Sequence, residues 1–71
     1  MTPELIAAKL ALRLAEQEAH EAADDFTAMP LHDPERELAF TLACRLFRVA
    51  ADASAAYVRA LSDYQDSLTN R

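Results

Sequence analysis

The stretch Met29-Pro30-Leu31-His32-Asp33-Pro34-Glu35 separates two long helix-forming segments in this 71-residue chain. Pro30 disfavours the α-helical conformation for the residue before it, so a helix that reaches this point ends there. Asp33 followed by Pro34 signals a new helix, because aspartate caps a free backbone N–H and proline fits the first helical position. We therefore predict a helix over about residues 3–28, a turn over 29–33 and a second helix over about 34–68.

Both segments carry apolar residues at alternating spacings of three and four, the period of a helix that buries one side. The first series is Leu5, Ala8, Leu12, Ala15, Ala19, Ala22, Phe26 and Met29. The second series is Phe40, Ala43, Phe47, Ala50, Ser54, Tyr57, Leu61, Tyr64 and Leu68. Folding the chain at the turn pairs residues whose numbers add to about 62, so that small Ala15 faces large Phe47. The sequence predicts one all-α domain, an antiparallel two-helix hairpin.

The apolar surface is wider than one neighbouring helix covers. A further series in the second segment comprises Ala39, Leu42, Leu46, Val49, Ala53, Ala56 and Ala60. We therefore expect two hairpins to pair as a dimer into an antiparallel four-helix bundle, either two identical chains or this chain with a different hairpin. The residues expected to drive self-association are Leu42, Leu46 and Val49. The next candidates, for dimerisation or for capture of a partner protein, are Leu61, Tyr64, Ile6, Leu10 and Leu14. With this pairing Leu61, Tyr64 and Leu68 project past the end of the first helix. Either they pack on another subunit, or the tail over residues 62–71 frays.

Length and composition restrict the protein class. A single domain of this size, in which alanine supplies much of the 52% apolar content, supports only a marginal monomer. Cys44 is the one cysteine and cannot form an internal disulfide, which fits a reducing compartment. No apolar run is long enough to cross a membrane. We expect a cytoplasmic protein.

Charge is unevenly distributed along the chain, whose net charge is −5. The segment from Glu16 to Glu37 contains eight acidic residues and one basic residue, Arg36. The acidic balance disfavours nucleic acid as a partner. One alternative function is therefore an acidic docking surface, or a nucleic-acid mimic, formed by the turn region.

A second alternative rests on Arg45, Arg48 and Arg59, which lie on the outer side of the second predicted helix. A dimer of such hairpins resembles in architecture the Rop-type plasmid regulators, and that resemblance implies RNA binding through this arginine face. The opposing interpretation is that Arg48–Asp52 and Arg59–Asp63 neutralise each other as pairs four residues apart.

Residues that could perform chemistry are few. His20 lies four residues from both Glu16 and Asp24, a spacing that places all three on one helix face, where a metal ion could in principle bind. His32 and Cys44 are not expected to point toward His20, so no four-ligand set forms. Neither a phosphate-binding loop nor a catalytic set is present in the sequence, and a two-helix hairpin offers no deep cleft. We expect no metal, no cofactor and no enzymatic activity. The predicted function is that of an interaction module: an adaptor, regulator or assembly chaperone.

Overall fold

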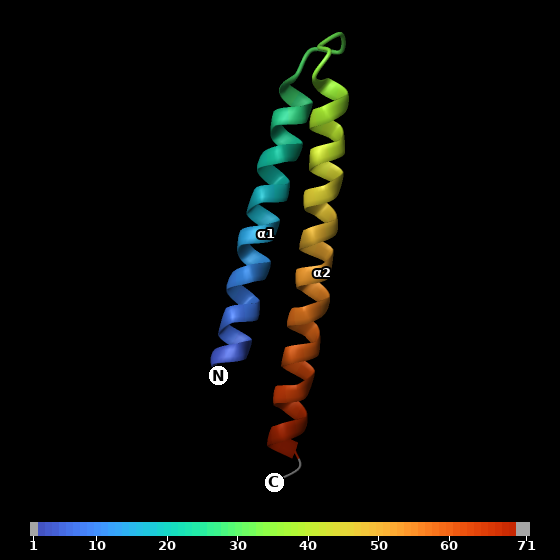
Figure 1. Cartoon of the computed structure of the whole chain (residues 1–71). Helices are drawn as coiled ribbons and strands as arrows, with labels where there is room; N and C mark the ends of the chain where they lie inside the picture. Colours follow the sequence, from blue (N-terminus) through green and yellow to red (C-terminus); the bar gives the residue numbers. More distant parts are fainter. Residues whose placement is uncertain (1, 70–71) are drawn as a thin grey trace.

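The computed structural model describes residues 2–69, which form two helices packed side by side (Figure 1). Helix α1 spans Pro3–Ala28 and helix α2 spans Arg36–Thr69, and no strand occurs within the described residues. The helices run antiparallel, and α2 extends past the start of α1 (Figure 1). The rod measures 60 × 13 × 12 Å, so it is only one helix pair wide. The predicted all-α hairpin is confirmed.

The first helix begins and ends at the predicted signals. The Thr2 hydroxyl accepts a hydrogen bond from the Leu5 N–H at 3.2 Å, which satisfies one of the free donors of the first turn. At the other end Met29 leaves the helix with an extended backbone, φ −75° and ψ 140°, as expected for a residue that precedes proline. Its N–H still donates to the Phe26 carbonyl at 3.2 Å, which closes the last turn.

The second helix starts two residues later than the sequence predicts. The Asp33 carboxylate accepts from the Glu35 N–H at 2.9 Å, and the Asp33 carbonyl accepts from the Arg36 N–H at 3.0 Å. These bonds give residues 33–36 a turn of their own, so the predicted turn at 29–33 is too short. Helix α2 then continues to Thr69, one residue past the predicted end at about 68. Asn70 and Arg71 lie outside the described residues.

The predicted pairing of the two helices is wrong by about four positions. His20 lies against Phe47 with ring centroids 5.8 Å apart, and Phe26 lies against Phe40 at 5.3 Å. The numbers of such facing residues add to about 66 rather than 62, because the connection is longer than predicted and α2 starts later. Leu5, only 1% exposed, is therefore level with Leu61. Leu61 is accordingly half-buried within the hairpin instead of projecting beyond α1.

The contact between the helices is made mainly of alanine. Five residues are buried within residues 2–69: one is Leu5, and the other four are Ala15, Ala19, Ala43 and Ala50. Phe40 and Phe47 were expected in this contact, yet they are 53% and 43% exposed. Alanine lets two helix backbones approach closely, whereas a phenylalanine between them would force them apart. The rings therefore lie along the flank, where Phe47 packs perpendicular to His20 and Phe40 packs against Phe26.

One side chain of α2 caps the end of α1. The Arg36 guanidinium lies 4.2 Å from the centre of the Phe26 ring, and its Nη1 donates to the Phe26 carbonyl at 3.1 Å and to the Met29 carbonyl at 2.8 Å. The carbonyls at the end of a helix have no N–H donor from a following turn. Arg36 supplies a donor to the Met29 carbonyl and a second one to the Phe26 carbonyl, which already accepts from the Met29 N–H, and so it links the turn to both helices.

Replacing Arg36 by methionine is expected to lower the free energy of unfolding by about 2 kcal/mol, because the apolar stem remains while two charge-assisted hydrogen bonds are lost. Chemical denaturation at a fixed protein concentration measures this loss. The control is Arg59→Met, which removes an exposed arginine from the middle of the same helix. An equal loss in both variants would contradict the capping role of Arg36.

Neither α1 nor α2 has the length and apolar content that a membrane-spanning helix requires, as judged over residues 2–69.

Candidate interaction surface

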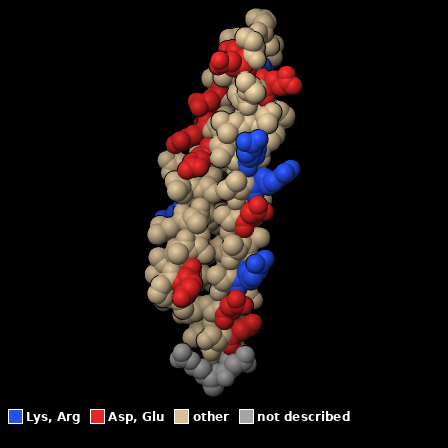
Figure 2. All heavy atoms as spheres, in the orientation of Figure 1, with Lys and Arg blue, Asp and Glu red and all other residues tan. Residues whose placement is uncertain are grey.

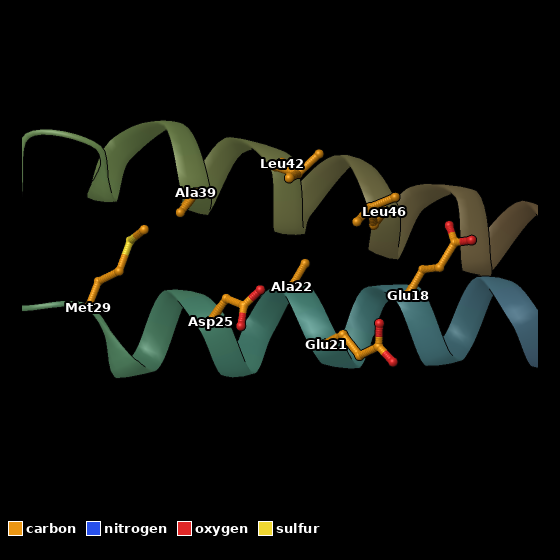
Figure 3. Close-up of a pocket in the computed structure, with 8 residues that line it drawn as sticks. All are labelled: Glu18, Glu21, Ala22, Asp25, Met29, Ala39, Leu42 and Leu46. Atoms are coloured by element: carbon orange, nitrogen blue, oxygen red, sulfur yellow. The ribbon is translucent and has the colours of Figure 1, made fainter.

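A shallow groove of about 390 Å³ runs between the helices near the turn (Figure 3). Ala22 and Ala39 make its floor, and because both are small the groove is hollow there. The α2 side is apolar and the α1 side carries carboxylates, as Figure 3 shows. The remaining lining residues are Leu42 and Leu46 from α2, and Glu18, Glu21, Asp25 and Met29 from α1.

The same face continues toward the open end of the hairpin as an apolar strip. On α1 the row Glu18, Glu21, Asp25 is preceded, at the same three-and-four spacing, by Leu14, Ala11 and Ala7. On α2 the row Leu42, Leu46 is followed by Val49, Ala53, Ala56 and Ala60. We call the surface made of these two rows, together with Leu10 beside Leu14, the groove face. It is acidic on one edge near the turn and apolar over the rest of its length.

The structure places most of the predicted interface residues on this face or at its border. Leu10, Leu14, Leu42 and Val49 all have about half or more of their side-chain surface exposed. Ile6, four residues before Leu10, lies at the outer border of the strip and is also exposed.

Three predicted interface residues are partly covered within the hairpin. Leu46 forms one wall of the groove, but it also packs on the buried cluster of Ala15, Ala19 and Ala50. Leu61 and Tyr64 are half-buried level with the start of α1. The hairpin contact therefore already uses part of their apolar surface.

The charged groups are unevenly distributed over the rod. Figure 2 shows acidic atoms gathered along the upper half of α1, and basic atoms interspersed with acidic ones along the outer edge of α2, with uncharged surface between the two edges. Arg45 and Arg48 line a second hollow of about 260 Å³ on that outer edge, together with Thr41 and Cys44. Arg59 is exposed farther along the same helix.

A third hollow, of about 420 Å³, lies at the turn end and was not foreseen from the sequence. Phe26, Leu31, Arg36 and Phe40 are among its lining residues. It arises because the phenylalanines lie on the flank of the hairpin rather than between the helices. The position of the rings on the flank depends on the register between the helices. The sequence did hold one signal of it, because two large rings next to a row of alanines do not fit between closely packed helices.

His20 does not gather ligands around it. Its ring packs perpendicular to that of Phe47, and within residues 2–69 no three His, Cys, Asp or Glu side chains lie close enough together to hold a metal ion. Glu16 and Asp24, the two carboxylates on the same face of α1, are exposed.

Comparison of the chain with protein-family models, with curated proteins and with solved structures gives no match. The groove face and its charged edges are the main surface features of the hairpin.

Proposed function

We propose that this chain is a small, non-enzymatic interaction module that dimerises through the groove face into a four-helix bundle. The observation that carries the proposal is the apolar strip: Leu10, Leu14, Leu42 and Val49 are exposed together on one side of a rod in which only five of the described residues are buried. Scattered exposed apolar residues are normal on a monomer, but a contiguous strip with charged edges is typical of an interaction surface.

Surface area supports the same proposal. The chain exposes 5537 Å², whereas a compact monomer of its mass exposes about 4400 Å². The difference exceeds the roughly 800 Å² that each partner buries in a standard protein–protein interface. Closing two groove faces on each other would bring the exposed area per chain into the range of ordinary globular proteins.

The role of the dimer is inferred from its shape. A bundle of two rod-shaped hairpins exposes surface on several sides and has no enclosed site, which suits an adaptor, a regulator or an assembly chaperone for another protein. The hollow at the turn end, beside Phe40 and Leu31, is a surface of this kind that the groove-face dimer leaves open. We place this activity in the cytoplasm, on the basis of the single free cysteine, Cys44, which is exposed.

The direct test is the mass in solution. Size-exclusion chromatography with light scattering at micromolar concentration is expected to give twice the chain mass of 7.9 kDa. Absorbance at 260 and 280 nm in the same run reports any nucleic acid that remains bound. A cooperatively folded monomer would refute the proposal.

The matched pair Val49→Asp and Val58→Asp tests which surface associates. Both valines lie in α2 and are exposed, 49% and 60%, but only Val49 lies on the groove face. Val49→Asp is expected to weaken the dimer about 30-fold or more, because it buries an unpaired carboxylate in the interface. Val58→Asp is expected to leave the dimer unchanged. Sedimentation equilibrium measures both dissociation constants, and the reverse result would assign the interface to the other side of the hairpin.

A further inference from the structure

The two charged edges of the groove face lie at the same height along the rod. Facing residues of α1 and α2 have numbers that add to about 66, as His20–Phe47 and Phe26–Phe40 show. Arg45 is therefore level with Glu21, and Arg48 is level with Glu18. At this height the acidic edge belongs to α1 and the basic edge to α2, with uncharged surface between them, and acidic atoms follow the basic ones farther along α2 (Figure 2).

We infer that the occupant of the groove face is a second copy of this chain, bound with the two turns at the same end and with the acidic edge of each copy against Arg45 and Arg48 of the other. This inference rests on the proposed function and specifies the geometry of its dimer. The two-fold axis runs along the rod, so α1 of each copy lies over α2 of the other and antiparallel to it. All helix neighbours in the resulting bundle are antiparallel.

The charges favour this orientation because the pattern is self-complementary. A two-fold axis along the rod keeps every residue at its own height and exchanges the two edges. Glu18 and Glu21 of one copy then meet Arg48 and Arg45 of the second copy, and the symmetry repeats the contact on the other edge. Charged residues that flank the apolar core of a helical bundle act in this way to set partner and orientation.

The packing agrees with the charges. With α2 of the second copy over α1, the apolar residues of α2 that lie level with Ala22 are Leu42 and Leu46. These are the side chains that would enter the groove above its floor of Ala22 and Ala39. Farther from the turn, Val49 of the second copy comes level with Gln17, between Glu18 and Leu14 of the groove face. Near the turn, large side chains thus face small ones, as layers of a packed core require.

The opposite orientation, with the turns at opposite ends, is disfavoured by the same residues. In this orientation α1 of one copy lies antiparallel over α1 of the second copy. With the rods fully overlapped, Glu18 and Glu21 then lie over Ala7, Leu10 and Ala11. Covering carboxylates with apolar side chains removes water from them without providing a partner, which is costly.

A spin-label measurement distinguishes the two orientations. The label is attached at His32→Cys, an exposed turn position, in a Cys44→Ser background. With the turns together, the two labels of a dimer are separated by about 20–30 Å, given interaxial distances of about 8–10 Å in a bundle and the reach of the labels. With the turns opposed, the separation is about 40 Å or more, since 26 residues of α1 rise about 1.5 Å each. A dimer with only the long distance overturns the inference and leaves the proposed function standing, whereas a folded monomer overturns both.

Charge exchange tests the edge contacts themselves. The first variant combines Arg45→Glu with Arg48→Glu, and the second combines Glu18→Lys with Glu21→Lys. Each variant alone is expected to dimerise about tenfold more weakly at low salt, because like charges then face each other. An equal mixture is expected to form mainly the heterodimer, since one copy has two acidic edges and the other two basic edges. Native mass spectrometry counts the species.

The control combines Lys9→Glu with Arg13→Glu, which changes the net charge as much as the first variant does but on the other side of α1. It is expected to leave the dissociation constant within about threefold of the parent, since these positions are not on the groove face. A statistical mixture of homodimers and heterodimers, or an equal weakening by the control, contradicts the edge contacts. Neither result bears on whether the chain dimerises.

Discussion

Leu46→Asp is expected to abolish both the dimer and the folded hairpin at micromolar concentration. Leu46 packs on the buried cluster of Ala15, Ala19 and Ala50 and also forms a wall of the groove. Truncating such a side chain costs about 2–5 kcal/mol, and placing a carboxylate there adds the cost of removing it from water. A chain of this length has about 3–5 kcal/mol of stability from its own core, so nothing remains to hold the helices together.

Circular dichroism during thermal denaturation, combined with light scattering, measures this effect. The control is Val58→Asp, which makes the same kind of change at an exposed position on the other side of α2. It is expected to keep the mass and the melting temperature of the parent. If Leu46→Asp also keeps both, then neither the hairpin core nor the dimer interface includes Leu46.

Ala19→Leu is expected to destabilise the hairpin by about 1–3 kcal/mol, the usual range for an overpacked core. Ala19 is fully buried where the helices meet, and a leucine at this position has to push α2 away. The change adds apolar surface and barely alters helix propensity, so the loss comes from geometry alone. Urea denaturation at fixed protein concentration gives the free energy.

The matched control is Ala55→Leu, at an exposed position of α2. It is expected to change the free energy of unfolding by less than about 0.5 kcal/mol, as for most exposed positions. If leucine is tolerated equally well at both sites, then the small size of Ala19 does not determine the distance between the two helices.

Local signals in the sequence predicted the hairpin because each acts within a few residues. Thr2 caps α1 as expected, and Pro30 ends it at the expected place. The alternating apolar spacing was sufficient to establish two long helices in antiparallel contact. None of these features depends on how the helices are aligned with each other.

The register was not predictable from the same signals, because it depends on the conformation of the turn. Asp33 serves as a cap, but it caps a separate turn that delays regular helix until Arg36. The connection therefore runs from Met29 to Glu35. With this later start of α2, the residues of α2 that face a given residue of α1 are about four positions farther along the chain than predicted. Alanine rather than phenylalanine occupies the contact because the helices lie close together. The periodicity of apolar residues carries no information about the distance between two helices.

The candidate surface was predicted in part. Leu10, Leu14, Leu42 and Val49 were identified correctly as apolar residues in excess of what one hairpin buries, and the structure leaves them exposed. Their dimerisation stays a prediction. The alignment of Glu18 and Glu21 with Arg48 and Arg45 could not be seen from the sequence, because it requires the true register between the helices.

The position of Arg36 has a consequence for how the chain folds. Its contacts with Phe26 and Met29 span only ten and seven residues of chain, so the loop that has to close to form them is short and its entropic cost is low. Contacts near Leu5 require the ends of a loop of more than fifty residues to meet. We therefore expect pairing to nucleate at the turn and to propagate toward the termini, and we expect the terminal end of the rod to separate first in thermal fluctuations.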